Sequence, residues 1–452
     1  MTHPERSDST PETTDTKSVS KKSKSLPDRR SFLAGTVASS TLATMAVHTE
    51  TSHADDQSLG DAVRIALVGC GGRGGGAIGD TMKINDNVAL VALADLDEEQ
   101  AGVMRRGMKR QFEDRIKVQD KDVYSGLDAY KHVLDHPDVD LVLFATPPGF
   151  RPQHILDAVE AGKHVFAEKP TCIDPHGYRV CLEAHKKAEE QKTAIVTGTQ
   201  YRRQSNFVEA IKRLHEGAIG DIISATSRYC SNGIWYKARR DGMSDTEYQI
   251  FNWMHFIWLS GDQIAEQAVH NIDVMNWIME GPPESAYASG GRFTRPDDSE
   301  MWDSMSVDYQ YPDDRLISFT CRQIPNTKSS NGTVVYGSQG KALIPAFSAT
   351  AYLWDRDGKE LWSMKGDLSA AYRQEHKELV ASIRSGTPIV ELQQTAESSL
   401  TAVMGRMAAY TGQEVTWDFV TQESKLNLFP DKIDLSAARD SGFAVPGGQE
   451  LI

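Results

Sequence analysis

The stretch Val63-Arg64-Ile65-Ala66-Leu67-Val68-Gly69-Cys70-Gly71-Gly72-Arg73-Gly74 decides the fold of this chain. Its first six residues form a short apolar run that is typical of a buried parallel strand. The glycines that follow complete a Gly-x-Gly-x-x-Gly motif. In this motif Gly69 permits a tight turn, Gly71 lets the backbone approach a pyrophosphate, and Gly74 lets the next helix pack close to the strand. The stretch therefore predicts the first strand–turn–helix unit of a dinucleotide-binding domain.

A second apolar run, residues 88–94, ends at Asp95. A carboxylate at this strand end accepts hydrogen bonds from the ribose hydroxyls of an adenosine and repels a 2′-phosphate. Asp95 therefore favours NAD over NADP as the cofactor, although one nearby arginine would reverse that preference.

The alternation of strand and helix patterns continues to residue 198. Three further apolar strands are predicted at residues 140–145, 163–167 and 194–197, with helices at 151–161 and 177–191 between them. This order is typical of a doubly wound α/β sheet, in which ligands bind at the carboxyl ends of the strands. We expect the functional groups at Gly69, Asp95, Thr146, Glu168, Lys169 and Gly198 to meet along one edge.

Four motifs together resemble those of the glucose–fructose oxidoreductase/inositol dehydrogenase (Gfo/Idh/MocA) family. They are the glycine motif, Ala145-Thr146-Pro147, the run from Ala161 to Val165 that leads into Glu168-Lys169-Pro170, and His270-Asn271-Ile272-Asp273. The resemblance covers about residues 62–420. It implies a Rossmann domain followed by an α+β domain with a large open, mainly antiparallel sheet. It also implies NAD(P)-dependent sugar oxidation, with cofactor contacts from Gly69, Gly71, Gly72, Arg73, Gly74, Asp95, Thr146, Pro147, His154, Glu168 and Lys169.

In relatives of this kind the lysine of Glu-Lys-Pro carries the proton, which assigns that role to Lys169, and the Lys-Pro bond is often cis. The physical chemistry agrees. An amine at a strand end, partly desolvated beside a positive nicotinamide ring, loses its proton more easily than one in water. The alternative is a surface lysine neutralised by Glu168.

Glu266, His270 and Asp273 follow i, i+4, i+7 spacing, which places them on one face of a predicted helix. The familiar family pattern is Asp-x-x-x-His, and here Glu266 stands at the acid position with one more methylene. The resemblance implies that His270 hydrogen-bonds the reacting hydroxyl, while Glu266 orients the imidazole or binds a neighbouring hydroxyl. A structural helix face and a Glu/His/Asp metal site remain as alternatives. We expect no metal, because hydride transfer needs only cofactor, base and geometry.

Further candidates for substrate contact combine aromatic and basic side chains. Aromatic side chains pack against the apolar faces of sugar rings, and arginines hydrogen-bond to hydroxyls or carboxylates. For any one of these residues core packing or solvation is an equal alternative. The candidates are Arg202, Trp235, Tyr236, Asp273 and Arg322.

The chain divides into five predicted parts: 1–60, 61–198, 199–371, 372–422 and 423–452. The third part contains a run of alternating apolar and polar residues at 285–360 that predicts antiparallel strands. In relatives the back of that sheet forms a dimer or tetramer interface, so we expect a homo-oligomer. The fourth part is helical and is expected to pack back on the Rossmann domain, with its acids, including Glu375, its amides and His376 solvated or capping. The last part is an extended tail.

The first part resembles a twin-arginine export signal. Arg29-Arg30 is followed by a mildly apolar run to Val47, and Ser52-His53-Ala54 offers small residues for a signal peptidase. This predicts a periplasmic or otherwise exported protein. The alternative is a disordered tail with a chance arginine pair.

Charge and composition argue against several other classes of protein. A net charge of −14 disfavours binding to nucleic acid or to an anionic membrane surface. No apolar run is long enough to be a convincing transmembrane helix. The five cysteines are scattered, which favours buried thiols over a disulfide framework.

These features predict an oxidoreductase that transfers hydride between the hydroxyl carbon of a sugar or polyol and nicotinamide. Two alternatives stay open. One is a glycoside hydrolase or lyase that uses NAD for transient oxidation at C3 followed by elimination. The other is a non-catalytic nucleotide-binding sensor.

Overall fold

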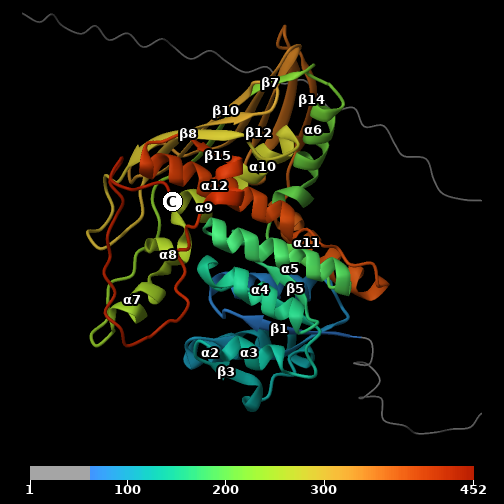
Figure 1. Ribbon diagram of the computed structural model, residues 1–452. Helices are drawn as coiled ribbons and strands as arrows, with labels where there is room; N and C mark the ends of the chain where they lie inside the picture. The colour runs from blue at the N-terminus through green and yellow to red at the C-terminus, as the bar shows by residue number, and fades with distance from the viewer. Residues whose placement is uncertain (1–61) are drawn as a thin grey trace, which may run out of the picture. The chain divides into compact units, whose positions relative to one another are not determined.

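The computed structural model describes residues 62–452 and contains two β-sheets flanked by helices (Figure 1). The predicted export signal with Arg29 and Arg30 lies outside the described residues. None of the described helices is long and apolar enough to cross a membrane.

The first sheet has six parallel strands in the order β3-β2-β1-β4-β5-β6. The strands are β1 (Val63–Val68), β2 (Val88–Asp95), β3 (Val123–Ser125), β4 (Leu141–Phe144), β5 (His164–Ala167) and β6 (Ile195–Thr197). The sequence predicted all of these except β3. That strand has only three residues, none of them buried, so it carries no apolar run.

Both faces of this sheet are covered, which explains why its strands are continuously apolar. Ile65 and Leu67 pack into one hydrophobic cluster, while Ala66 and Val68 pack into another. The covering helices are α1 (Gly72–Ile84), α2 (Glu98–Phe112), α3 (Ala129–Leu134), α4 (Arg151–Glu160) and α5 (Pro175–Gln191). The structure thus confirms a doubly wound Rossmann-like sheet.

The second sheet has nine strands in the order β14-β13-β12-β11-β7-β10-β9-β8-β15. Every neighbouring pair is antiparallel except β7 and β10. The bounds are β7 (Ile222–Ser231), β8 (Ser285–Gly291), β9 (Ser304–Tyr311), β10 (Arg315–Gln323), β11 (Ser330–Gly337), β12 (Gly340–Pro345), β13 (Thr350–Asp355), β14 (Glu360–Lys365) and β15 (Val415–Thr416). The mainly antiparallel second sheet is therefore confirmed.

Helices α6 (Ser205–His215) and α10 (Val269–Met279) lie against the second sheet, and α7 (Asp245–Phe251), α8 (Ile257–Ser260) and α9 (Asp262–Glu266) connect β7 to α10. Helix α11 (Leu368–Ser385) packs on α1, and α12 (Leu392–Thr411) packs on both α5 and β8. Both α11 and α12 therefore contact helices of the first sheet, and α12 also contacts the second sheet.

The prediction that Glu266, His270 and Asp273 share one helix is wrong. The amides of Gln267 and Ala268 both donate to the carbonyl of Gln263, which closes α9 at Glu266, and α10 begins only at Val269. Glu266 is therefore on a different helix from His270 and Asp273.

His376 is not solvated, contrary to prediction. Its Nδ1 lies 3.0 Å from Thr81 Oγ1 on α1, and its ring packs 4.2 Å from the ring of Phe166. The reason is that α11 lies against α1, so this face of α11 is interior. Burial lowers the pKa of His376 to about 3, so the imidazole is neutral.

Beyond the short π-helical turn Phe419–Glu423, the chain forms the predicted extended tail without further helix or strand in the described residues. This tail runs beside α7 and α8 (Figure 1). The amide of Leu428 donates to Asp174 Oδ2 (2.8 Å), and the indole of Trp302 donates to the carbonyl of Ala444 (3.0 Å). All five cysteines are buried and free, as predicted.

Candidate active site

The glycine motif forms a turn that leaves open space at the start of α1. Gly69 has a φ of +94°, and a Cβ on Gly74 would lie 2.1 Å from the carbonyl oxygen of Gly69. A Cβ on Gly71, in contrast, would meet nothing within 4 Å. Free backbone amides and the positive end of a helix dipole are what a pyrophosphate binds. The local geometry therefore fits the phosphates of a dinucleotide.

Asp95 stands at the carboxyl end of β2 beside that turn. Its Oδ2 accepts from the amide of Cys70 (2.6 Å) and its Oδ1 accepts from the amide of Asp97 (3.1 Å). Burial raises the pKa of Asp95, and the amide hydrogen bonds act against that rise. Its carboxylate is thereby oriented at the position expected for the ribose.

A cavity of about 680 Å³ lies above these residues. Six of the predicted cofactor-binding residues line it: Gly69, Gly71, Asp95, Thr146, Pro147 and His154. The ring of His154 packs 4.0 Å from that of Tyr130, which lines the cavity too, and burial lowers the pKa of His154 to about 3. A neutral, aromatic-rich wall of this kind suits an adenosine. Another part of the lining comes from the stretch 237–253, which follows β7.

Glu168 and Lys169 follow β5 and point to different partners. Glu168 is buried, and its Oε1 accepts from Arg73 Nε at 2.5 Å. The guanidinium of Arg73 also lies over the ring of Tyr372 at 4.6 Å, and its Nη2 is 3.9 Å from Glu375 Oε1. Arg73 of the glycine motif is thus bound to the residue that precedes the predicted proton carrier.

The side chain of Lys169 reaches across to the second domain. Its Nζ donates to the backbone carbonyl of Glu266 (2.5 Å) and to Glu266 Oε1 (3.1 Å). Both side chains are largely buried, with exposures of 11% and 8%. The Lys169–Pro170 peptide bond is cis, as the resemblance implied.

His270 lies close to this pair, but the described hydrogen bonds do not link it to Glu266. Glu266 Oε2 accepts from the side-chain amide of Gln267. The His270 ring is edge-on to Tyr201 at 5.8 Å. Burial, followed by the nearby cations Lys169 and Arg73, holds the pKa of His270 well below its ordinary value. His270 is therefore a neutral imidazole that donates a hydrogen bond from one ring nitrogen and accepts one at the other.

The predicted substrate residues are distributed over several places. Arg202 pairs with Asp273, with Nη2 2.9 Å from Oδ1, and it lines a separate cavity of about 330 Å³. Arg322 donates to the carbonyl of Lys328 (2.7 Å). None of Arg202, Asp273 and Arg322 lines the 680 Å³ cavity.

The two aromatic candidates lie behind the wall formed by residues 237–253. Trp235 packs edge-to-face on Trp253, whose ring is 5.8 Å away and lines the 680 Å³ cavity. Tyr236 donates its hydroxyl hydrogen to Asp298 (3.0 Å).

Sequence reasoning missed Arg151, which supports the backbone around Lys169. Its buried guanidinium donates to the carbonyls of Lys169 (2.6 Å), Pro170 (2.8 Å) and Thr146 (2.6 Å). Burial lowers the pKa of Arg151 to about 10. The only available signal was an arginine followed by proline at the start of a predicted helix, which does not reveal three distant acceptors.

Sequence reasoning also missed a buried acid beside the site. Glu375 of α11 is fully buried, and neither of its carboxylate oxygens has a hydrogen-bond partner in the described chain. Burial, together with the neighbouring Glu168, raises the pKa of Glu375 well above its ordinary value. The sequence pattern of α11 had suggested a solvated acid.

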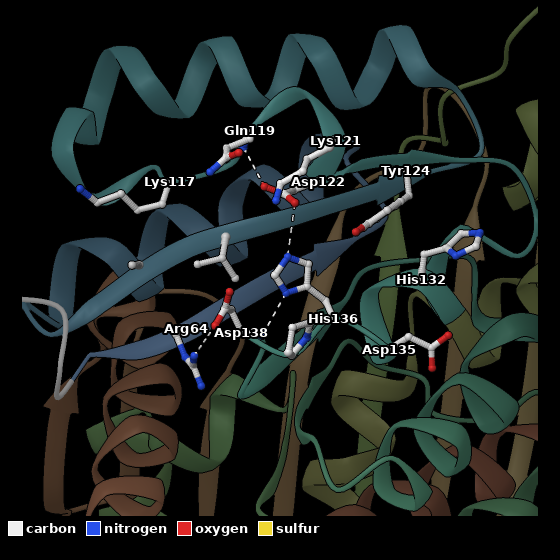
Figure 2. A pocket seen from close by; sticks show the side chains of 13 residues that line it. Arg64, Lys117, Gln119, Lys121, Asp122, Tyr124, His132, Asp135, His136 and Asp138 are labelled. Carbon is white, nitrogen blue, oxygen red and sulfur yellow. Dashed lines mark hydrogen bonds and ion pairs between the residues drawn. The ribbon is translucent and has the colours of Figure 1, made fainter.

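A second cavity, of about 620 Å³, is lined by residues of β1, β2 and β3 and of the segments beside them (Figure 2). Two pairs among its charged side chains contact one another: Arg64 bonds to Asp138 (2.8 Å), and His136 Nε2 lies 3.4 Å from Asp122 (Figure 2). None of Gly69, Asp95 and Lys169 lines this cavity.

Comparison with known proteins agrees with this geometry. The model of the Gfo/Idh/MocA oxidoreductase family with an NAD-binding Rossmann fold matches residues 63–197. The model of the Gfo/Idh/MocA C-terminal domain matches residues 207–343. Together the two matches cover more than half of the chain.

Individual relatives are more distant. A myo-inositol 2-dehydrogenase from Thermotoga maritima is 23% identical over 340 residues, which are 72% of this chain and 90% of that protein. A 2,7-anhydro-N-acetylneuraminate hydratase from Mediterraneibacter gnavus is 25% identical over 255 residues, covering 56% of this chain and 59% of that protein.

The fold also matches a solved structure. The crystal structure of myo-inositol 2-dehydrogenase from Lactobacillus plantarum superimposes with a TM-score of 0.61 and 19% identity, covering 78% of this chain and 99% of that one. The chain belongs to the Gfo/Idh/MocA family of NAD-binding oxidoreductases.

Proposed function

We propose that this protein is a dehydrogenase that transfers hydride between the hydroxyl carbon of a sugar or polyol and NAD, with Lys169 as the general acid–base. The observation that carries the proposal is the position of Lys169 Nζ. It lies at the carboxyl edge of the Rossmann sheet, where it is held by two oxygens of Glu266 from the second domain.

The geometry of the amine suits proton transfer in both directions. A neutral amine has two hydrogens and one lone pair, and here the carbonyl and the carboxylate of Glu266 accept two hydrogens. The remaining tetrahedral position is left for a substrate hydroxyl, either as a lone pair that takes its proton or as a third hydrogen that returns it. Bound NAD supplies the carbon that accepts the hydride.

His270 supports the same hydroxyl without competing for its proton. Because burial and the neighbouring cations keep its imidazole neutral, it binds by a hydrogen bond and adds no positive charge beside Lys169. Closure of the two domains around the substrate would hold the reacting atoms in place and exclude water.

The test is a substrate panel of polyols, aldoses and glycosides with NAD, followed by the absorbance of reduced nicotinamide. Lys169→Met should retain NAD binding and lose turnover by roughly 10²–10⁴-fold on the substrate found. Near-normal kcat in this variant would contradict the assignment of the base.

A second candidate function is elimination with transient oxidation, in which NAD is regenerated and no net reduction occurs. The similarity to a protein named as a hydratase supports this second candidate. Release of an aglycone or of water without accumulation of reduced nicotinamide would support this candidate over the dehydrogenase. Binding of a sugar with no turnover at all would instead indicate a sensor.

We also propose that the protein is exported by the twin-arginine route, on the strength of Arg29-Arg30 and the apolar run that follows them. Replacement of both arginines by lysine should leave the full-length protein in the cytoplasm. Unchanged recovery of a mature form that begins near Asp55 would contradict this.

Finally, we propose a homo-oligomer that forms through the outer face of the second sheet. Leu316 and Tyr336 are exposed there on either side of Ser224, and Tyr287 is 61% exposed on β8. Exposed apolar side chains on one sheet face support an interface between copies. Leu316→Lys together with Tyr336→Lys should lower the mass measured by light scattering, whereas an unchanged mass would locate the interface elsewhere.

A further inference from the structure

Two cationic side chains line the 680 Å³ cavity together with Gly69 and Gly71 of the glycine turn. Among the described residues that line this cavity, the cationic side chains are Lys237 and Arg240, since His154 is neutral. Both belong to the segment between β7 and α7, residues 232–244. The Rossmann side of the cavity contributes the acids Asp95 and Asp97, and the region that carries the two cations contributes Asp241 and Glu247.

The glycine motif has a cation of its own, but that cation is engaged elsewhere. Arg73 donates to Glu168 and lies over Tyr372. A pyrophosphate above Gly71 would therefore meet backbone amides from the Rossmann side and no free cation from the motif. Backbone amides and the dipole of α1 suffice to bind a pyrophosphate, and cations from another element would add charge-assisted hydrogen bonds to its two negative charges.

Lys237 and Arg240 are placed side by side without carboxylate partners in the described chain. Each lies against the ring of Phe251, with Lys237 Nζ at 4.4 Å and the Arg240 guanidinium at 4.3 Å. Burial and the neighbouring Arg240 lower the pKa of Lys237. Adjacent Arg239 differs, because it is paired with Asp245 at 2.7 Å.

The segment that carries these cations is anchored by the rest of the second domain. The amide of Lys237 donates to Asn252 Oδ1 (3.1 Å), and Ser244 and Glu247 form a capping box at the start of α7. The C-terminal tail adds further bonds, from Thr246 Oγ1 to the carbonyl of Ala437 (3.2 Å) and from the amide of Arg439 to Asp245 Oδ2 (3.2 Å). These hydrogen bonds hold the segment in place. The capping box also binds the carboxylate of Glu247, an acid that lines the cavity.

We propose that Lys237 and Arg240 complete the dinucleotide site, binding the pyrophosphate of NAD from the side opposite Gly71. The second domain then takes part in cofactor binding as well as in binding the substrate. Release of NAD requires that these two cations separate from the phosphates, so the cofactor leaves slowly between turnovers. The inference rests on NAD as the cofactor and is independent of the substrate proposed above.

The test measures nucleotide binding by calorimetry to the full chain with Lys237→Met, Arg240→Met and the double variant. Methionine keeps the stem against Phe251 and removes the charge. The probes are NAD and ADP-ribose, which contain the pyrophosphate, and adenosine, which does not. Arg239→Met is the matched control, since it removes a neighbouring charge that does not line the cavity.

The double variant should raise the Kd of NAD and of ADP-ribose by roughly 10–100-fold and leave that of adenosine unchanged, because charge-assisted hydrogen bonds to phosphate are lost. Its Kd for NAD should also depend less on salt, and stopped-flow displacement should show faster release of NAD. Arg239→Met should bind all three probes as the unmodified protein does.

Two results would overturn the proposal. One is an unchanged Kd for NAD and ADP-ribose in the double variant. The other is an equal loss for adenosine, or the same loss in Arg239→Met, because either would show a general change of the segment. Lys237 and Arg240 are both exposed, so the Kd of each single variant can still be measured if the double variant proves unstable. Since these readouts need no substrate, they separate this inference from the proposed dehydrogenase activity.

Discussion

Lys169 Nζ lies 3.1 Å from Glu266 Oε1 and also donates to the backbone carbonyl of the same residue at 2.5 Å. Lys169 follows β5 of the Rossmann sheet, and Glu266 ends α9 of the second domain. The direction of the amine is thus determined jointly by the two domains. Glu266 contacts Lys169, whereas the resemblance implied that it would orient the imidazole of His270 or bind a neighbouring hydroxyl.

Glu266→Gln should test this relationship. The carboxylate of Glu266 accepts a charge-assisted hydrogen bond from Lys169 Nζ, and an amide in its place accepts a weaker one. We therefore expect kcat to fall by roughly tenfold, because the amide holds the amine less firmly. A rise in KM alone, with an unchanged kcat, would instead mean that Glu266 only binds the substrate. Asp273→Asn is the control, since Asp273 pairs with Arg202 and should leave kcat unchanged.

Asp95 should set the preference for NAD. Asp95→Asn keeps an acceptor for the amide of Cys70 and removes the charge that repels a 2′-phosphate. We expect the Kd of NAD to rise by about tenfold and that of NADP to fall, as measured by calorimetry. If NADP already binds more tightly than NAD to the unmodified protein, our interpretation of this strand end is incorrect.

Arg151 should act as a positioning residue for Lys169. Arg151→Lys keeps the charge but replaces the two guanidinium nitrogens that reach these three carbonyls by a single ammonium nitrogen, so kcat should fall by roughly tenfold or more while the Kd of NAD stays unchanged. We also expect a loss of about 2–3 kcal/mol of unfolding free energy from buried carbonyls left without donors.

Arg406 provides a matched control for that experiment. Its buried guanidinium also donates to two backbone carbonyls, those of Gly261 and Ile173, but not to the peptide of Lys169. Arg406→Lys should lower stability in denaturant titrations and leave kcat intact. Equal losses of kcat in the two variants would mean that Arg151 has a purely structural role.

Glu300 should make stability depend on pH. Its Oε2 accepts from the amide of Ile257 (2.7 Å), and burial raises its pKa from the ordinary 4.5 to about 7. Between these values the folded protein binds a proton that the unfolded chain has released. The contribution of Glu300 to stability is therefore complete below 4.5 and is lost as pH rises toward 7.

Glu300→Gln removes this titration. Urea unfolding at a series of pH values should show that the unmodified protein loses on the order of 2–3 kcal/mol relative to Glu300→Gln across this window. Parallel pH profiles for the two proteins would show that Glu300 has an ordinary pKa in the folded state.

The strand and helix pattern of the Rossmann domain could be predicted because it depends on neighbouring residues. Apolar runs such as 88–94 and 140–145 are sufficient for buried parallel strands. The turn after β1 requires glycine at position 69 for its φ of +94° and at position 74 for its close approach to the carbonyl of Gly69, and both reasons lie within a few residues. The short strand β3 was missed since three partly exposed residues carry no such pattern.

Helical periodicity failed where the chain turns sharply. The spacing of Glu266 and His270 is that of a helix face, yet the amides of Gln267 and Ala268 share one carbonyl and end α9 between them. His376 and Glu375 were expected at the surface because their own helix gives no sign that α1 covers it.

By itself, the sequence determined the dinucleotide fold, the family and the strand ends at which chemistry can occur, because turns, periodicity and motifs are local properties of the chain. Only the tertiary structure decided that Lys169 meets Glu266, that Arg151 holds the peptide of Lys169, and that Arg240 lines the same cavity as Gly71. The physical reason is that these contacts form when two domains and a tail pack together, and packing between distant segments depends on the shape and charge of whole surfaces.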